Sequence, residues 1–253
     1  MQASRRVLVS GLAVIGAALL AAPRSAHAGR TFYGWLYGTE VMPERGAEIQ
    51  TFVEEQNEQS HQLNLSETDW WISPAIGIND QLELLLPVDL VWTDDDGDRP
   101  RFTIANYGAE LRYRLVTADP TDKPAFVPLV RVALKRDVTG DGDTWQPEGD
   151  LVASYDIGRT QLLADFGVLG VINKTTTDIE LHPGVGVSVL SIGDVRFGAE
   201  AFAEIPLETT DQTWVAVGPN MAWSHGRSWI SAAYGVGLYH IRDAPKLNWG
   251  IAF

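Results

Sequence analysis

The feature that most constrains the fold is an apolar–polar alternation with a period of two residues. Over residues 81–93 the even positions carry Leu, Val and Trp, whereas the odd positions include Glu83 and Asp89. Segments 102–115 and 195–205 alternate in the same way. Past the N-terminal region we find neither a sustained 3.6-residue period nor an apolar run of the roughly 18 residues that a membrane-spanning helix needs. The sequence therefore predicts β-strands with one apolar face and one polar or small-residue face.

Short turns and longer polar loops alternate between the predicted strands. Gly193-Asp194 is typical of the short turns, and the stretch 94–100 (DDDGDRP) is typical of the longer loops. Outer-membrane barrels have this asymmetry, with short periplasmic turns and longer external loops. We expect twelve strands, at residues 46–57, 62–78, 81–93, 101–117, 125–138, 150–158, 161–173, 178–191, 195–206, 213–224, 228–241 and 246–253. The predicted fold is all-β: a single antiparallel up-and-down transmembrane β-barrel of about 12 strands with a polar lumen.

The N-terminus has the anatomy of a secretory signal peptide over residues 1–28. Two Arg residues precede an apolar run, and a small-x-small sequence predicts cleavage near Ala28-Gly29. We expect residues 29–45 to form a periplasmic N-terminal lead-in and residues 46–253 to form the transmembrane barrel domain. A signal peptide followed by a barrel predicts a location in the bacterial outer membrane.

The last segment, KLNWGIAF, also alternates, and it ends on an aromatic residue. Its outward-facing set is Leu247, Trp249, Ile251 and Phe253. This pattern resembles the terminal assembly signal of bacterial outer-membrane barrels, so we expect the barrel-assembly machinery and outer-membrane lipid as partners. The alternative is a soluble lipocalin-like barrel with its apolar residues inside. The opposite strand faces are too charged to form such a packed interior.

The segment Tyr37–Gln56 (YGTEVMPERGAEIQTFVEEQ), which leads into the first predicted strand, is similar to one family. It resembles the start of outer-membrane proteins grouped under the meta-pathway of phenol degradation, which enter their first strand through a Thr/Glu–Pro–Gly stretch. The resemblance covers about twenty residues and contains no catalytic motif. It implies a transport barrel related to channels for hydrophobic compounds.

Composition and motifs exclude several classes of function. The chain has 33 acidic and 19 basic residues, and its net charge of −14 argues against nucleic acid as a partner. It has no Cys, which excludes disulfides, thiolate metal sites and cysteine nucleophiles. We find no phosphate loop, dinucleotide fingerprint or phospholipase motif, although chain spacing leaves open a pairing of His182 with Ser188. We therefore predict no enzymatic activity and no catalytic residues.

The inward faces of the predicted strands give a charged lumen. With strict alternation, the lumen-lining residues are Glu83, Asp89, Glu110, Arg112, Arg114, Arg131, Lys135, Asp165, Glu180, Arg196, Glu200 and Glu204. Glu48, Glu54 and Asp156 face the same way, so ten acids face five bases. The charges either pair to fill a narrow interior or line a selective pore, and an open lumen would favour cations.

One acidic loop, residues 137–148 (DVTGDGDTWQPE), is similar to an EF-hand calcium pattern. Asp137, Thr139, Asp141, Asp143 and Glu148 occupy positions 1, 3, 5, 7 and 12 of that pattern. Strands rather than helices flank the loop, so a solvated acidic turn is the alternative. We expect no cofactor other than this Ca²⁺.

Together these features predict an outer-membrane channel or transporter for a small solute, with hydrophobic or aromatic compounds as candidates. The competing prediction is a structural or adhesive barrel whose lumen is plugged and whose external loops carry the function. An outer-membrane enzyme acting on lipid comes third.

Overall fold

The computed structural model describes residues 31–57, 66–94, 101–116, 125–139, 144–209 and 212–253. The strands are β1 (Ala47–Asn57), β2 (Ser66–Asn79), β3 (Leu82–Leu85), β4 (Val88–Asp94), β5 (Arg101–Arg114), β6 (Phe126–Asp137), β7 (Thr144–Ile157), β8 (Thr160–Ile172), β9 (Thr177–Leu190), β10 (Val195–Pro206), β11 (Trp214–His225), β12 (Ser228–Tyr239) and β13 (Asp243–Ala252). Within these residues no helix is long and apolar enough to cross a membrane. The signal peptide and its cleavage site lie outside the described residues.

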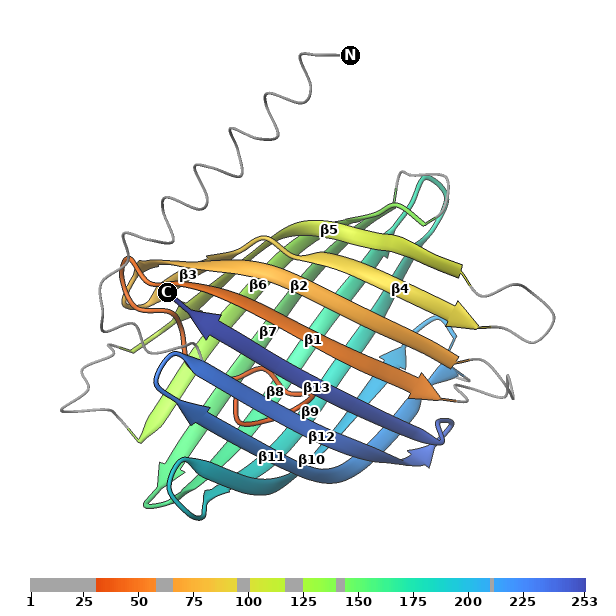
Figure 1. The fold of residues 1–253 in the computed structure, drawn as a ribbon. Coiled ribbons are helices and arrows are strands. Elements are labelled where there is room, and N and C mark those ends of the chain that lie inside the picture. The colour runs from red at the N-terminus through yellow and green to blue at the C-terminus, as the bar shows by residue number, and fades with distance from the viewer. Residues whose placement is uncertain (1–30, 58–65, 95–100, 117–124, 140–143, 210–211) are drawn as a thin grey trace.

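The strands form one closed antiparallel barrel (Figure 1). Closure occurs at β1, where Glu48 pairs with Ala252 of β13 on one side and with Ala75 of β2 on the other. β3 and β4 are two parts of one crossing, because both lie between β2 and β5. Pro87 separates them, since proline has no N–H to donate to the ladder. The thirteen strands therefore make twelve crossings, and the predicted twelve-strand all-β barrel is confirmed.

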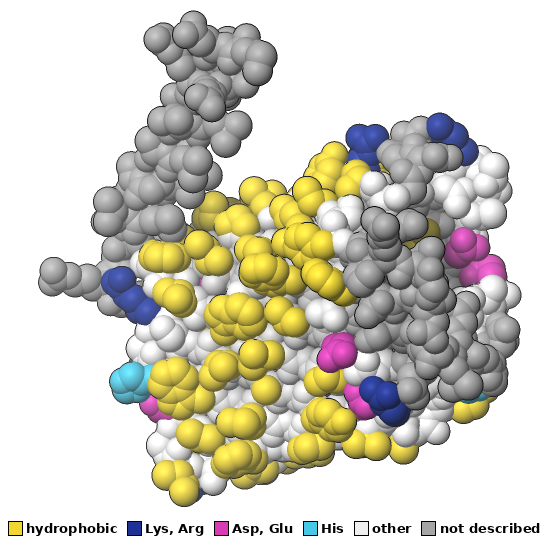
Figure 2. Space-filling view, turned by 45° about the vertical axis from the view of Figure 1, so that its right-hand side comes forward, with side chains coloured by type: hydrophobic (Ala, Val, Ile, Leu, Met, Phe, Trp, Pro, Cys, Tyr) yellow, Lys and Arg dark blue, Asp and Glu magenta, His cyan; other side chains and the backbone are white. Residues whose placement is uncertain are grey.

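Apolar side chains cover the outer face of the barrel (Figure 2). On β5, for example, Tyr107, Leu111 and Tyr113 are exposed, whereas Glu110 and Arg112 are buried inside. A soluble barrel would have the opposite arrangement. This one suits hydrocarbon as the surrounding solvent, because a closed barrel leaves no backbone edge unpaired in the bilayer.

The two ends of the barrel differ in their connections. Three short turns depend on Gly158, Gly193 and Gly226, whose φ angles of 60°, 57° and 59° lie in the left-handed region that L side chains rarely adopt. These turns lie at the end where β1 begins and β13 finishes, here called the turn end. The opposite end, here called the loop end, carries most of the longer connections; the exception is residues 115–125, which join β5 to β6 at the turn end.

The segment expected as a periplasmic lead-in lies instead inside the barrel. Residues 31–46, here called the inner segment, enter the lumen and lead back to β1 at the turn end (Figure 1). Tyr33 and Met42 are 0% exposed, and Leu36 is 5% exposed. The prediction for residues 29–45 was therefore wrong over the described part. The physical reason is that an aromatic-rich segment gains more by burying its side chains in the lumen than by exposing them to water.

We expect Phe253 to be needed for barrel assembly. Its backbone N–H donates to the carbonyl of Ala47 at 2.8 Å, so it forms the last bond of the closing β1–β13 seam. On β13, Leu247 and Ile251 are exposed outward, while Asn248 is buried inside. Deleting Phe253 should lower the amount of folded, heat-modifiable protein in the outer membrane, because an incompletely closed seam leaves a bare strand edge. Normal levels of folded protein after the deletion would contradict this.

Candidate functional site in the barrel lumen

A carboxylate of the barrel wall fixes the apex of the inner segment. Glu200, on β10, is 2% exposed. Its carboxylate accepts hydrogen bonds from the backbone N–H groups of Gly34, Trp35 and Leu36, at 2.8, 3.2 and 3.3 Å. Successive N–H groups that converge in this way make a natural anion site. Bonds from N–H groups to a charged acceptor are also stronger than bonds between neutral groups.

Two further polar contacts hold the segment beyond this apex. The backbone N–H of Tyr37 donates to Asp165 of β8 at 3.0 Å. The hydroxyl oxygens of Thr39 and Ser154 lie 2.7 Å apart, and both residues are buried. The inner segment is therefore tied to three strands of the barrel wall, β7, β8 and β10.

Aromatic packing adds to these bonds. Trp35 stacks on Phe202, with ring centroids 4.3 Å apart, and its indole N–H donates to the carbonyl of Ala244 at 3.0 Å. Gly186, on β9, makes room for the segment, because a Cβ atom there would lie 2.5 Å from the ring of Tyr33. The segment and the wall thus fit each other closely along this side.

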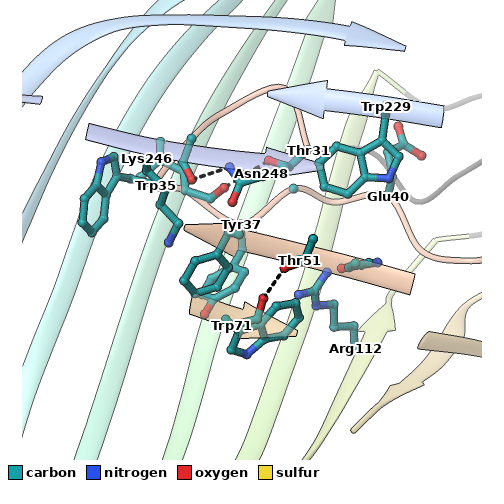
Figure 3. A pocket seen from close by; sticks show the side chains of 15 residues that line it. Thr31, Trp35, Tyr37, Glu40, Thr51, Trp71, Arg112, Trp229, Lys246 and Asn248 are labelled. Carbon is teal, nitrogen blue, oxygen red and sulfur yellow. Dashed lines mark hydrogen bonds between the residues drawn. The ribbon is translucent and has the colours of Figure 1, made fainter. Parts of the chain in front are cut away.

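A small cavity of about 50 Å³ remains between the inner segment and the opposite wall (Figure 3). Trp35 and Tyr37 line it from the segment, and Trp71 and Lys246 line it from the wall. Thr51 donates to the carbonyl of Trp71 at 2.6 Å and so fixes β1 against β2. Burial raises the pKa of the Tyr37 phenol well above its ordinary value, so this side chain is neutral at physiological pH.

A buried ionic network lies against Tyr37 on the wall formed by β3, β5, β6 and β7. Its centre is Arg131, which is 1% exposed. Arg131 forms ion pairs with Glu110, Glu148 and Asp150, at N···O distances of 2.7, 2.7 and 2.5 Å. The guanidinium lies 4.1 Å from the centre of the Tyr37 ring, so the inner segment covers the network.

Two more cations complete this network. Arg112 pairs with Glu110 at 2.6 Å and with Glu83 at 3.4 Å. Lys135 pairs with Glu148 at 3.1 Å. All seven side chains of the network lie on the inner faces of their strands. This part of the lumen is thus filled by paired charges.

Toward the loop end, the lumen holds a cavity of about 680 Å³, here called the chamber. The inner segment lines it through Trp35, Leu36 and Tyr37. Nine acidic side chains face it: Glu54, Glu67, Asp69, Asp89, Asp137, Glu148, Asp150, Asp165 and Glu204. Lys135, Lys246 and His182 are the basic side chains of its lining. Its volume lies within the range of about 300–1,000 Å³ that is usual for small-molecule sites.

The structure places all twelve predicted lumen residues on the inner face of the barrel. Seven of them lie outside the network, and one of these, Glu200, holds the inner segment. The other six have these partners: Asp89 with Asn106 at 3.1 Å, Arg114 with Glu40 at 3.5 Å, Asp165 with Tyr37, Glu180 with His182 at 2.7 Å, Arg196 with Ser188 at 2.9 Å, and Glu204 with Trp214 at 2.9 Å. His182 and Ser188 lie six residues apart on β9, about 20 Å along the strand, so the pairing of His182 with Ser188 is not formed.

The expected calcium loop loses one of its ligands. β7 begins at Thr144 rather than near residue 150, and Glu148 lies inside the barrel with Arg131 and Lys135. Glu148 is therefore not available as the twelfth-position ligand. At the other end of the loop, Asp137 accepts hydrogen bonds from the N–H and hydroxyl of Thr139, at 2.8 and 2.6 Å. Asp141 and Asp143 lie outside the described residues.

The sequence analysis missed the inner segment as part of the site. Its sequence from residue 31 is TFYGWLYG, in which four of the first seven residues are aromatic. Such a density of Phe, Tyr and Trp between small glycines is unusual for a segment exposed to water. That composition was the available signal, although it has no strand or helix period that would place it.

Comparisons with known proteins bear on the fold. No protein-family model matches the sequence, and no curated protein is significantly similar to it. Among solved structures, an outer membrane channel from Pseudomonas putida F1 is similar with a TM-score of 0.57 and 11% identity, over 85% of this chain and 98% of that one. The family resemblance of residues 37–56 therefore stays a prediction.

Two other solved barrels are about as similar. The β-domain of the Bordetella autotransporter BrkA has a TM-score of 0.55 and 13% identity, over 82% of this chain and 99% of that one. The KdgM porin has a TM-score of 0.51 and 9% identity, over 81% of this chain and 99% of that one. The fold is thus that of outer-membrane β-barrels, as predicted. A channel, an autotransporter domain and a porin share it, so the fold alone does not decide the function.

Proposed function

We propose that the chain is an outer-membrane channel for small solutes, closed by its inner segment in the present conformation. The chamber is the observation that carries this proposal. It provides about 680 Å³ in the loop-end half of the lumen, and the inner segment lines it. A barrel with a purely structural role has no need for such a volume, since side chains could fill it.

Passage through the barrel requires the inner segment to move. Its apex is held by Glu200, Asp165 and the Thr39–Ser154 contact, none of which is a covalent bond. Displacing the segment would leave the β-ladder of the barrel intact, because residues 31–46 form no strand. The segment is therefore suited to act as a gate.

The charge of the chamber supports a preference for cations. Two of its cations are already paired, Lys246 with Glu54 at 2.5 Å and Lys135 with Glu148 at 3.1 Å. Among the described residues, Glu67 and Asp69 form no ion pair, and the acidic side chains of the chamber lining outnumber its basic ones. Carboxylates in a low-dielectric cleft concentrate cations and repel anions.

The competing proposal is a barrel plugged permanently by the same segment. The close packing of Trp35 on Phe202 and the burial of Tyr33 and Met42 favour it. The two proposals differ in one measurable property, since only a gated channel conducts when the segment is released.

A reversible lock of the inner segment tests the proposal. The chain has no Cys, and the hydroxyls of Thr39 and Ser154 lie 2.7 Å apart, so Thr39→Cys with Ser154→Cys should form the sole disulfide. In a planar lipid bilayer we expect cation-selective openings of the reduced variant, loss of openings after oxidation, and recovery after reduction. Each single Cys variant is the control and should not respond to the oxidant.

The outcome that would contradict the channel is specific. If the wild type and the reduced variant show no openings, and solute uptake into liposomes is also absent, the lumen is plugged. Openings with anion selectivity would instead contradict only the proposed charge preference.

A further inference from the structure

We propose that the wall of the chamber binds a first-row divalent cation of the Zn²⁺ class through Glu180, His182 and Glu204. One donor atom from each of these side chains lies within 4.8 Å of the other two. The inference goes beyond conduction, because the site belongs to the barrel wall and stands whether or not the lumen opens.

The strand register brings these residues together. Glu180 and His182 are two residues apart on β9, so both side chains point into the lumen. β9 pairs with β10 so that Leu181 faces Ile205, which places Glu204 beside His182. Neighbouring residues of this kind have Cβ atoms about 4.5–5.5 Å apart, close enough for both side chains to contact one ion. The three donors thus lie on two paired strands of a rigid ladder.

The contacts of the three side chains leave room for a metal ion. The His182 Nε2 and Glu180 Oε1 atoms are 2.7 Å apart and share one proton. A metal ion bonds to each such atom at about 2.0–2.2 Å, so it can take the place of that proton once the two atoms separate slightly. Glu204 is oriented by the indole N–H of Trp214, which donates to its Oε2 at 2.9 Å. Partners of this kind orient the ligands in known metal sites.

The arrangement of the two carboxyl groups and their access to the chamber both favour metal binding. Glu180 contacts His182 at 2.7 Å and Glu204 accepts a hydrogen bond from Trp214, so both carboxyl groups lie beside one imidazole. His182 and Glu204 line the chamber, which gives an ion a route to the site. Three protein ligands facing a cavity leave a further coordination position for water or a solute.

The mixture of ligands determines the class of ion. One imidazole with two carboxylates suits Zn²⁺, Co²⁺ and similar ions, whereas Ca²⁺ and Mg²⁺ prefer oxygen ligands alone. The site is therefore distinct in chemistry from the acidic loop that begins at Asp137.

The test is Zn²⁺ titration of the folded full-length barrel in detergent, by calorimetry, with Co²⁺ absorption as a second readout. We expect about one Zn²⁺ per barrel, and Co²⁺ should show visible bands that Zn²⁺ removes. His182→Ala and Glu204→Gln should each weaken binding at least 10-fold. Trp214→Phe, which loses the donor to Glu204, should weaken it about 10–100-fold.

The chain offers a matched control. His225 also contacts a carboxylate, that of Asp194 at 2.9 Å, but on the exposed surface of a turn. His225→Ala should leave Zn²⁺ binding unchanged, and heat-modifiable gel mobility should show that every variant is folded. Full binding by folded His182→Ala, or displacement of Zn²⁺ by equal concentrations of Ca²⁺, would overturn the proposal. Absence of Zn²⁺ binding to the wild type would do so as well.

Discussion

Replacing Arg131 with Met should destabilise the barrel by about 3–5 kcal/mol, the range measured when one partner of a buried ion pair is removed. Arg131 is 1% exposed and is the shared counter-charge of Glu110, Glu148 and Asp150. Met fills similar space but leaves three carboxylates crowded together inside the lumen. Urea unfolding in detergent, followed by heat-modifiable gel mobility, measures the loss.

Two further variants separate charge from packing. Arg227, in an exposed turn, is the control for the substitution itself, and Arg227→Met should change stability very little. Neutralising Asp150, whose ion pair is with Arg131, by Asp150→Asn in the Arg131→Met background should restore part of the stability, because Glu110 and Glu148 keep their pairs with Arg112 and Lys135. If this combination is less stable than Arg131→Met alone, the packing of Arg131 matters more than its charge.

The strands were predictable because a bilayer imposes one rule on every crossing. Each crossing needs an apolar face toward lipid and a small or polar face toward the lumen, and a period of two residues shows this directly. The rule fails where polar residues dominate both faces. The sequence pattern of residues 144–149 (TWQPEG) predicts a loop. In the structure they form the first part of β7, where Asp137 pairs with Thr144 and Arg136 with Trp145.

The pairing of lumen charges could not be predicted from alternation alone. Alternation gives the face of each residue, whereas ion pairs depend on the register between strands. The register places Arg112 directly opposite Arg131, an unfavourable pair that the surrounding acids must neutralise. The same register places Glu204 beside His182. Sequence analysis therefore identified the charged residues and left open which of them meet.

The inner segment was hidden for a different reason. Residues 31–46 follow the wall of the barrel with an irregular backbone, so they have neither of the periodicities that sequence patterns can show. Their place depends on partners more than 100 positions away, such as Glu200 and Asp165. Because those partners are buried carboxylates, the segment and the lumen charges form one structure.

Replacing Glu200 with Gln should raise the open probability of the channel about tenfold or more. The carboxylate accepts three N–H groups of the inner segment, whereas an amide has only one oxygen to accept them and its NH₂ group faces N–H donors. Hydrogen bonds to a charged group contribute about 1.5–3 kcal/mol each. Since about 1.4 kcal/mol corresponds to a factor of ten in an equilibrium, losing even one should shift the gate measurably. Single-channel recording in planar bilayers gives the open probability.

The control for this substitution is Glu67→Gln, which removes a carboxylate from the chamber without touching the inner segment. It should lower cation selectivity and leave gating unchanged. Adding Glu200→Gln to the Thr39→Cys, Ser154→Cys pair separates the two roles further, because the oxidised triple variant keeps the segment tied at Thr39 whatever happens at its apex. If Glu200→Gln raises conductance equally in the oxidised and reduced states, the added current comes from a change in lumen charge. If the conductance increases only after reduction, the added current comes from release of the inner segment.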